Sequence, residues 1–550
     1  MKASIASERP LQGASLPRAQ RSGSGQPRTW LGGLAAWRLG FVLVVLTGLT
    51  ACGVLPTQAV RDEPPLPPTR TAGPLDRLAA DGPPAGTPPD ASAFVLVDDG
   101  LDALAARVAL IRSAQRTLDW QTYIWANDTT GQLLMRELLR AADRGVRVRL
   151  LLDDNNTPGL DPLLNLLDAH PAIAVRLFNP FPSRAARVFD WVSEFPRLNR
   201  RMHNKLLVAD GTVALLGGRN VGDVYFRASE DVYFDDTDLL LRGPVLAAAH
   251  ASFERYWHSN WSYGLHGLLA PESDTSEALE ARLQAALAQP AARPWRTELR
   301  QSHVVRALLQ PVGAWTWAPM TLLDDPPNKV SATATAADGV GTGLFQRLEA
   351  LFGGARESLD LVSAYFVPGE EGTQALTALA RKGVQVRVLT NSLATNDVVA
   401  AHVGYARHRQ ALIAGGVSLL EQRSDAAVAG TAPPRPRLIA SRASLHAKTF
   451  VVDAEDVFIG SLNLDPRSSR LNTEVGVIVQ SPALAAQLRW RLDHDAGHAW
   501  QVGWDTEGMY HVPGGPESGQ MTRVRGEPSA GWGRRVLVWV LSWFDLDWLL

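Results

Sequence analysis

One stretch that occurs twice decides the fold: "MHNKLLVADGTVALLGGRN" at residues 202–220 and "LHAKTFVVDAEDVFIGSLN" at residues 445–463. The same skeleton recurs in both copies at identical spacing. It consists of His203, Lys205, Asp210, Gly217 and Asn220 in the first copy, and of His446, Lys448, Asp453, Gly460 and Asn463 in the second. A single pattern of this kind is more often an edge strand with solvated charges. Two copies with equal internal spacing indicate a duplicated functional site.

The sequence around both copies is duplicated as well. Helical patterns alternate with Val-rich strand patterns, as in "GQLLMRELLRAADRG" before "VRVRLLLDD" and "GTQALTALARKG" before "VQVRVLTNS". Gly145 and Gly383 are predicted to end the two helices. Alternating strands and helices predict an α/β fold, so we expect two tandem α/β repeats, at residues 94–275 and 341–500. Residues 276–340 are predicted only to connect them.

The N-terminal region has the layout of a secretion signal followed by a tether. An apolar run after arginine-rich sequence ends at Leu49-Thr50-Ala51-Cys52, and it is shorter than the roughly 20 residues that a transmembrane helix needs. The four residues resemble the lipobox of bacterial lipoproteins. We therefore expect residues 1–51 to be a signal peptide and Cys52 to be lipidated. Residues 52–93, rich in Pro, Ala and Gly, are predicted to form an extended tether without a core.

The C-terminal extension, residues 501–550, ends in the Trp-rich segment "WGRRVLVWVLSWFDLDWLL". Trp is favoured at the level of lipid head groups and a basic flank is attracted to anionic lipid, so this amphipathic end could lie in a membrane interface. The alternative is a terminal helix that packs on the protein body.

Bulk composition narrows the function only a little. The chain has 550 residues, enough for two domains with proper cores, and a formal net charge of -2. A binder of DNA or RNA usually shows a basic domain or stripe, so nucleic acid is disfavoured as a substrate. With Cys52 as the single cysteine, neither an intramolecular disulfide nor a zinc site built from cysteines can form.

The residue types in the duplicated motif suit chemistry at phosphorus. A histidine can attack phosphorus or deliver a proton near neutral pH. A lysine supplies positive charge to the non-bridging oxygens, and an asparagine amide can donate to the same oxygens. If the duplication brings the copies face to face, one histidine can be the nucleophile and the other the general acid of an in-line displacement. Two lysines and two asparagines could then do the work of a metal.

Each histidine should be oriented by a carboxylate that accepts a hydrogen bond from its other ring nitrogen. Aligning "EVGVIVQSPALA" with "DTDLLLRGPVLA" places Glu474 opposite Asp236, with Asp235 and Asp238 as close competitors. We expect Asp236 and Glu474 to be the orienting acids, and we expect Glu474 to serve His446, which precedes it in the same repeat.

These paired HxKxxxxD motifs resemble those of the phospholipase D superfamily. The stretches "YIWANDTTGQLL", "GGRNVGDVYF", "HVGYARHR" and "LNLDPRSS" are similar to those of bacterial cardiolipin synthases of the C type. The resemblance implies two phospholipase D-like repeats, with mixed sheets flanked by helices, that share one active site at their pseudo-twofold interface. It also implies that no metal or other cofactor is used.

The resemblance further implies a phosphatidyltransferase. A phosphatidyl group passes to a histidine and then to an alcohol, which in cardiolipin synthesis is the glycerol head group of phosphatidylglycerol. The donor would be another phosphatidylglycerol or phosphatidylethanolamine. The superfamily pattern makes His203 the nucleophile and His446 the general acid. Arg219 and Arg467 could also meet phosphate, although a solvated surface arginine is the commoner case.

Two other functions remain open at this point. One is a phosphodiesterase of the same superfamily, a lipid hydrolase or, less in keeping with the charge, a nuclease. The other is an inactive membrane scaffold, which is disfavoured because every motif residue is intact in both copies. The expected partners are phospholipid substrates and a membrane surface. The expected location is a bacterial membrane, with the body lipid-anchored and facing the periplasm.

Overall fold

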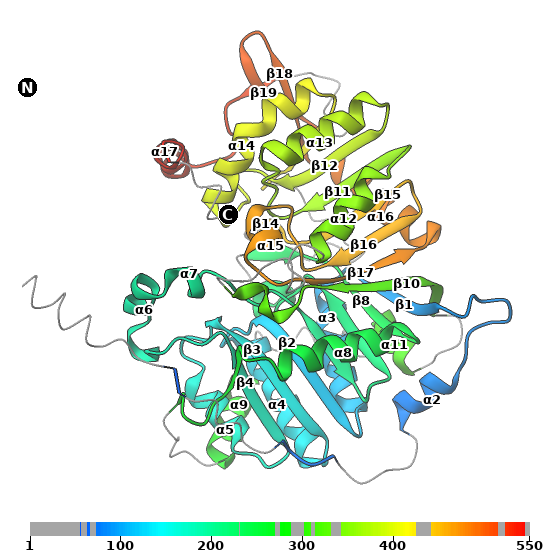
Figure 1. The fold of residues 1–550 in the computed structure, drawn as a ribbon, viewed down its shortest axis with the longest axis vertical. Helices are drawn as coiled ribbons and strands as arrows, with labels where there is room; N and C mark the ends of the chain where they lie inside the picture. Colours follow the sequence, from blue (N-terminus) through cyan, green and yellow to red (C-terminus); the bar gives the residue numbers. More distant parts are fainter. Residues whose placement is uncertain are drawn as a thin grey trace, which may run out of the picture. The chain divides into compact units, whose positions relative to one another are not determined.

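Two halves of the chain fold into alternating strands and helices (Figure 1). The first half contains β1 (Ala91–Val97), α3 (Gly100–Ser113), β2 (Thr117–Ile124), α4 (Thr129–Asp143), β3 (Arg147–Asn156), α5 (Asp161–Asp168), β4 (Ile173–Phe178), α6 (Arg187–Ser193), α7 (Phe195–Leu198), β5 (Leu206–Ala209), β6 (Val213–Gly217), β7 (Val232–Asp235), β8 (Asp238–Arg242), α8 (Val245–Trp257) and β9 (Ser262–Gly264). The second half contains α12 (Leu344–Gly353), β11 (Ser358–Ser363), α13 (Gly369–Arg381), β12 (Gln385–Asn391), α14 (Val399–Ala414), β13 (Ser418–Gln422), β14 (Arg442–Leu445), β15 (Lys448–Val452), β16 (Asp456–Gly460), α15 (Pro466–Arg470), β17 (Val475–Gln480) and α16 (Pro482–Ala496).

Further elements precede, join and follow the two halves. They are α2 (Pro74–Ala80), α9 (Ser276–Leu287), α11 (His303–Leu309), β10 (Thr316–Asp324), β18 (Trp500–Asp505), β19 (Gly508–Pro513), β20 (Val524–Arg525) and α17 (Trp532–Leu541). This computed structural model describes residues 55–56, 63–66, 73–229, 232–269, 276–287, 302–309, 314–331, 343–424, 442–514 and 523–544. The predicted signal peptide and Cys52 lie outside the described residues, as do parts of the predicted tether and the last residues of the Trp-rich end.

Local sequence signals explain where the central helices begin and end. Asp128 caps α4 by accepting a hydrogen bond from the backbone N–H of Gly131. Gly145 follows α4 with φ of 88°, and Gly383 follows α13 with φ of 97°. Both angles lie in the left-handed region that glycine adopts without a steric penalty. The two predicted helix stops are therefore confirmed.

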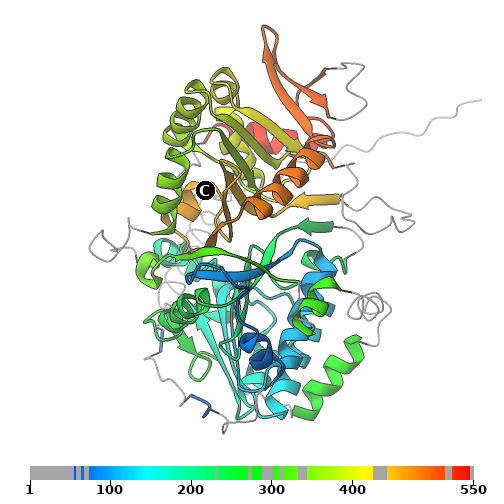
Figure 2. The same cartoon turned by 90° about the vertical axis from the view of Figure 1, so that its right-hand side faces the viewer.

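A continuous ladder of hydrogen bonds joins both halves in an 18-stranded sheet of the described residues. In the first half β2, β3 and β4 run parallel, and β2 pairs antiparallel with β5 on its other side. The second half repeats this order with β11, β12 and β13 parallel and with β15 antiparallel to β11. Helices flank these strands in both views (Figures 1 and 2). The predicted α/β class, with mixed sheets flanked by helices, is confirmed.

The sheet passes from one half to the other through β1 and β10. These two strands pair with each other, and each also pairs with a strand of its own half, β1 with β8 and β10 with β17. In the second half β10 thus has the place that β1 has in the first. Residues 276–340, which we expected only to connect the repeats, therefore include a strand of the second repeat. Residues 325–343 separate that strand from α12, which hides the correspondence in the sequence.

The two halves also share a hydrophobic core. Leu206, Leu239 and Leu241 of the first half belong to the same buried cluster as Val475 and Val477 of the second. Interiors packed in this way hold their elements in fixed register. The shared core therefore fixes the relative positions of side chains that the two repeats contribute to a common site.

Part of the predicted tether is folded, which corrects the expectation for residues 52–93. Leu75 and Leu78 lie on one face of α2 and are buried in the core of the first half. Asp76 of the same helix forms an ion pair with Arg116. The Pro-rich composition concealed a short amphipathic turn, because two leucines three positions apart suffice to give a helix an apolar face.

Candidate active site

Both motif histidines lie beside the carboxyl ends of parallel strands. His203 comes shortly before β5, which is antiparallel to β2, so the start of β5 lies beside the end of β2. His446 comes shortly before β15, which pairs in the same way with β11. In sheets with parallel strands this edge is where binding sites usually form.

Each histidine contacts a carboxylate of the opposite repeat. Nδ1 of His203 lies 2.9 Å from Oε2 of Glu474, and Nδ1 of His446 lies 2.5 Å from Oδ2 of Asp236. Asp236 and Glu474 are thus the acids at the histidines, as we expected, but the expected pairing of Glu474 with His446 is wrong. All four side chains are buried.

The backbone enforces this crossed arrangement. The N–H of His203 donates to the carbonyl of Thr473, the residue before Glu474, at 2.9 Å. The N–H of His446 donates to the carbonyl of Asp235, the residue before Asp236, at 2.7 Å. Strand β14 leads into His446 and runs parallel to β7 of the other repeat. Each histidine is therefore tied to the segment that carries the opposite acid.

The two motif lysines contact the histidines and are buried as well. Lys205 Nζ donates to the carbonyl oxygen of His203 at 2.6 Å, and Lys448 Nζ lies 3.0 Å from Nδ1 of His446. Burial lowers the pKa of both lysines. A buried ammonium gains stability when an anion binds beside it, because the anion compensates the lost hydration.

The histidine pKa values report one shared site. The pKa of His446 is lowered to about 4, mainly by burial and then by Lys448 and Lys205, while Asp236 opposes the shift. Burial holds the pKa of His203 well below its usual value, again with contributions from Lys205 and Lys448. Each histidine thus senses the lysines of both repeats. The predicted single site at the interface of the repeats is confirmed by this geometry.

The two acids differ in charge. Burial raises the pKa of Glu474 to about 7, although the attraction of Lys205 opposes it. Burial acts on Asp236 in the same direction, but attraction to His446 and Lys448 outweighs it and the pKa falls to about 2. Asp236 is therefore a permanent anion near neutral pH, whereas Glu474 is only partly ionised.

The two motif asparagines occupy unequal positions. Both polar side-chain atoms of Asn220 have protein partners. Its Oδ1 accepts from the N–H of Ile124 at 3.2 Å, and its Nδ2 donates to the hydroxyl of Tyr225 at 3.0 Å. Asn463 is also buried, yet its Oδ1 finds no hydrogen-bond donor among the described residues. The second repeat therefore offers an unused acceptor to a bound molecule.

The structure does not bring the motif aspartates to the histidines. Asp210 follows β5 at the end away from His203, roughly 16 Å from Lys205 at the rise of an extended strand. Its carboxylate accepts from the backbone N–H groups of Gln115, Arg116 and Thr117.

Asp453 has the same role in the second repeat. It accepts from the backbone N–H groups of Arg356, Glu357 and Ser358, and both aspartates have positive φ. Asp210 and Asp453, which we expected to be catalytic, thus fasten the turn after one strand to the start of the neighbouring strand.

The two extra arginines bind protein groups. Arg219 is buried, forms an ion pair with Asp238 and donates to the carbonyl oxygens of Tyr225 and Asp236. Arg467 donates to the backbone carbonyl and the side chain of Asn199 in the other repeat. The first supports the segment that carries Asp236, and the second helps to join the repeats.

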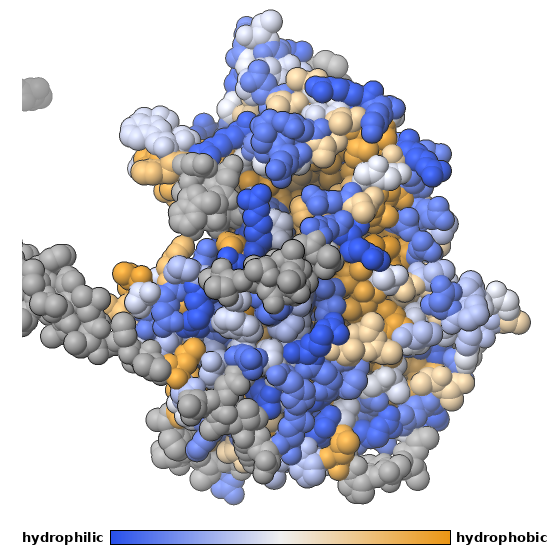
Figure 3. Space-filling model, viewed as in Figure 1, coloured by the Kyte–Doolittle hydropathy of each residue, from blue (hydrophilic) through white to orange (hydrophobic). Residues whose placement is uncertain are grey.

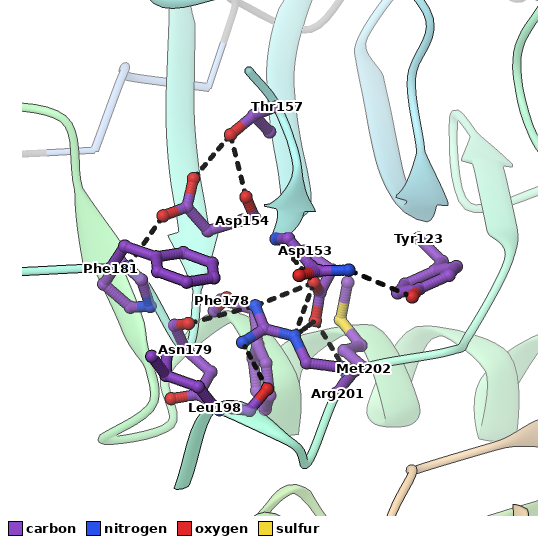
Figure 4. A network of polar contacts seen from close by, with 12 residues as sticks. Tyr123, Asp153, Asp154, Thr157, Phe178, Asn179, Phe181, Leu198, Arg201 and Met202 are labelled. Atoms are coloured by element: carbon purple, nitrogen blue, oxygen red, sulfur yellow. Dashed lines mark hydrogen bonds and ion pairs between the residues drawn. The ribbon is translucent and has the colours of Figure 1, made fainter. Parts of the chain in front are cut away.

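Sequence reasoning missed the groups that hold the histidine segments. Arg201 donates to Asp153 at the end of β3, and the N–H of Met202 donates to the same carboxylate, both at 2.8 Å (Figure 4). Asp325 accepts from the N–H of Glu474 at 3.1 Å and from Nζ of Lys329 at 2.8 Å. The adjacent acids in "LLLDD" and "TLLDDPP" were visible in the sequence, but nothing there showed their partners.

Aromatic rings border the two histidines. The ring of Tyr123 meets His203 edge to face at a centroid distance of 4.9 Å. Tyr225 and Phe234 lie 5.3 Å from His446, centroid to centroid. Apolar neighbours of this kind explain the strong desolvation that lowers the histidine pKa values.

Among the described residues, two other clusters contain side chains of the kinds that bind metals, and in both an arginine already neutralises the carboxylates. Asp119, His250 and Glu254 lie close together, with Arg149 bonded to both acids. The second group, Glu421, His511 and Glu527, encloses Arg409. A guanidinium at this position occupies the place of a metal cation.

Comparisons with known proteins agree with the geometry. Residues 108–257 and 348–496 match the family described as "Cardiolipin synthase, PLD-like domain". The chain is 42% identical over 459 residues to cardiolipin synthase C of Escherichia coli (strain K12), covering 82% of this chain and 95% of that protein. It is 26% identical over 399 residues to cardiolipin synthase B of the same organism, covering 72% and 79%.

One solved structure shares the fold across both halves. The crystal structure of phosphatidylserine synthase from Haemophilus influenzae Rd KW20 superposes with a TM-score of 0.52 at 16% identity, covering 76% of this chain and 88% of that one. The residues that match the family model lie in both repeats, and they include both histidines and both acids of the crossed pairs. This chain therefore belongs to the cardiolipin synthase family of phospholipase D-like proteins.

Proposed function

We propose that this chain is a phosphatidyltransferase, which forms cardiolipin by passing a phosphatidyl group through a phosphohistidine to the glycerol head group of phosphatidylglycerol. The observation that carries the proposal is the crossed pair of histidine–carboxylate contacts. They hold two imidazoles, one from each repeat, in a single site with two lysines. The identity to cardiolipin synthase C of Escherichia coli supports the choice of lipid reaction.

In the first step Nε2 of His203 attacks the phosphorus of the donor lipid. The P–O bond to the head group breaks, and His446 gives its ring proton to the leaving oxygen, so that phosphatidylglycerol releases glycerol. In the second step a hydroxyl of another phosphatidylglycerol attacks the phosphorus. His446 takes the proton of that hydroxyl, the P–N bond breaks, and His203 returns to its starting state.

The carboxylates support this order of the two histidines. With its pKa near 4, His446 has to gain a proton when the anionic phosphodiester binds and offsets the charges of both motif lysines. Asp236, a permanent anion, then stabilises the imidazolium that acts as the acid. Glu474, with a pKa of about 7, can lose its proton near neutral pH and then accept the Nδ1–H of a neutral His203, which leaves Nε2 free to attack phosphorus. In both pairs the contact at Nδ1 reserves Nε2 for the substrate.

The lysines and Asn463 would bind the reacting groups. Lys205 and Lys448 are buried beside the histidines and can neutralise the non-bridging oxygens of the phosphodiester. The unused Oδ1 of Asn463 can accept a hydrogen bond from a hydroxyl of the acceptor glycerol. An acceptor alcohol held by Asn463 would compete better with water for the phosphohistidine, which favours transfer over hydrolysis.

A lipid reaction requires that the protein work at a membrane. Each methylene removed from the bilayer costs about 0.8 kcal/mol, and a lipid with two acyl chains has a few tens of them, so extracting it would cost more than about 20 kcal/mol. None of the helices among the described residues is long and apolar enough to cross a bilayer. We propose attachment at the periplasmic face of a bacterial membrane, aided by a lipid on Cys52.

The proposal is tested with the purified full chain and vesicles that contain isotopically labelled phosphatidylglycerol. We expect labelled cardiolipin and free glycerol in equal amounts by mass spectrometry, and neither product from His203→Ala or His446→Ala. Phosphatidic acid without cardiolipin would show that the enzyme is a phospholipase. Expression in cells that lack their own cardiolipin synthases should restore cardiolipin, and Cys52→Ser should abolish lipoprotein processing of a tagged chain.

A further inference from the structure

The short helix α6 (Arg187–Ser193) shows the reverse of the usual burial pattern. Val188 and Val192 are 75% and 81% exposed, and Phe189 is more than half exposed, whereas the carboxylate of Asp190 is buried. Asp190 accepts a hydrogen bond from the N–H of Ser183 at 2.7 Å, which turns the polar side of the helix inward. The buried hydrogen bond of Asp190 therefore orients α6 so that its apolar side chains face outward.

The helix α17 (Trp532–Leu541) presents a second apolar surface. None of its residues is buried, and Trp532, Trp539 and the following Trp543 are each more than half exposed. The alternative that this segment is a terminal core helix is therefore wrong for the described residues. Arg535 is exposed on the same helix and gives it positive charge.

Polar contacts fix α17 in place. Arg534 donates to the backbone carbonyl oxygens of Leu393 and Asn396, at 2.8 Å and 2.7 Å. Just before the helix, Glu527 forms an ion pair with the buried Arg409 of α14 at 2.7 Å. The apolar residues of α17 are thus presented by a fixed helix and not by a loose tail.

Both helices are linked to the edge of the sheet that carries the active site, α6 through the chain and α17 through a loop that it contacts. The segment with α6 leaves the carboxyl end of β4 and runs directly into Arg201 and His203. The loop that binds Arg534 leaves the carboxyl end of β12, where Asn391 holds the backbone of Leu445 beside His446. In Figure 1 both helices lie at the left margin, and Figure 3 shows hydrophobic side chains there.

We propose that α6 and α17 are two halves of one membrane-docking surface, which sits in the interface of a phospholipid bilayer and presents the active site to it from between the two repeats. The proposal rests on the proposed lipid reaction. Apolar residues in a short helix, Trp side chains and a basic residue together suit the boundary between head groups and acyl chains. The positive charge of Arg535 fits an anionic lipid better than it fits an apolar protein partner.

The test measures vesicle binding and chemistry separately. Full-length variants Val192→Glu on α6 and Trp539→Glu on α17 are compared with Trp490→Glu, a matched control at a 66% exposed tryptophan of α16. Every chain carries Cys52→Ser, so that a lipid on this cysteine cannot contribute. Binding is measured by flotation with vesicles of phosphatidylethanolamine and phosphatidylglycerol, and turnover is measured on a monomeric short-chain phosphatidylglycerol.

We expect each docking variant to bind vesicles at least tenfold more weakly, and the double variant to lose binding, while Trp490→Glu binds like the parent. Turnover on the monomeric lipid should stay within about twofold for all variants, which also shows that they are folded. Normal vesicle binding by Val192→Glu would overturn the two-helix surface. Absence of turnover in the parent itself, with vesicle binding intact, would contradict the proposed reaction and leave the docking surface standing.

Discussion

The two halves of the active site contain the same motif residues, yet they differ in charge and in support. His446 faces a carboxylate whose pKa is about 2, and His203 faces one whose pKa is about 7. The difference comes from the surroundings, because the positive groups around Asp236 outweigh burial and those around Glu474 do not. A duplicated site can therefore assign different roles to identical side chains through their neighbours.

The support of the two histidine segments differs in the same way. In the first repeat the end of β3 supplies Asp153, which forms a fully buried ion pair with Arg201 (Figure 4). In the second repeat the corresponding position at the end of β12 is Asn391, whose amide bonds the N–H and carbonyl of Leu445. One half is thus held by charge and the other by neutral hydrogen bonds.

The largest effects are expected from substitution of the two histidines, and they distinguish the nucleophile from the general acid. His203→Asn and His446→Asn should each lower cardiolipin formation by about 10³-fold or more, because each removes a group that the reaction needs. With a phosphatidyl donor whose leaving group is p-nitrophenol, the leaving oxygen needs no proton. A burst of p-nitrophenol from His446→Asn but not from His203→Asn is expected in rapid-mixing absorbance measurements. The reverse pattern would exchange the two roles.

The next effect concerns the two carboxylates. Asp236→Asn removes a full negative charge from beside the acid, and we expect a loss of about 10³-fold in turnover. Glu474→Gln replaces a group that is already half protonated near pH 7, so a smaller loss of about 10²-fold is expected. Equal losses would show that the difference between the two acids has no part in the reaction.

The rate of the first step should depend on pH through the ionisation of Glu474. Only ionised Glu474 accepts the Nδ1 proton of His203 and leaves Nε2 free to attack. Because the pKa of Glu474 is raised to about 7, its ionised fraction, and with it the rate of the first step, should rise as the pH increases through about 7. Single-turnover rates should keep this rise in Asp236→Asn and lose it in Glu474→Gln. A rise that persists in Glu474→Gln would have to come from another group.

Much of the fold could be predicted from the sequence, because its signals are local. Period, helix stops such as Gly145 and Gly383, and the spacing within each motif concern neighbours along the chain. The crossed pairing of His203 with Glu474 could not be predicted in this way. It follows from the pairing of β14 with β7 and from the bridge between Met202 and Thr473, which are contacts between repeats.

Two other differences have physical causes of their own. Asp210 has the residue type of a catalytic acid, but its left-handed turn and its three backbone donors are visible only in three dimensions. The exposure of Val188 and Val192 was hidden because a short apolar run has the same composition in a core and on a lipid-facing helix. Their direction is decided by Asp190, which is buried where an apolar residue would be expected.

The contacts that hold the two histidine segments should contribute differently to the stability of the protein. Asp153→Asn leaves the guanidinium of Arg201 buried without its counter-charge, and we expect the free energy of unfolding to fall by about 3–5 kcal/mol. Asn391→Ala removes neutral hydrogen bonds to Leu445 and should cost about 1–3 kcal/mol. Chemical denaturation measures both, with the exposed Asp143→Asn as the control. Equal costs would show that Arg201 finds other partners once Asp153 is neutral.

The smallest effect should come from the motif asparagines, and it tests whether the empty acceptor of Asn463 serves the second substrate. Asn463→Ala removes a group without a protein partner for its Oδ1, so stability should change little while the KM for the acceptor phosphatidylglycerol rises about fivefold to tenfold. Asn220→Ala loses hydrogen bonds to Ile124 and Tyr225, so its main effect should be a lower melting temperature. If Asn463→Ala leaves the acceptor KM unchanged, recognition of the acceptor must come from other groups. A shift toward phosphatidic acid in Asn463→Ala would strengthen the assignment, because water competes better once the bound alcohol has lost its hydrogen bond.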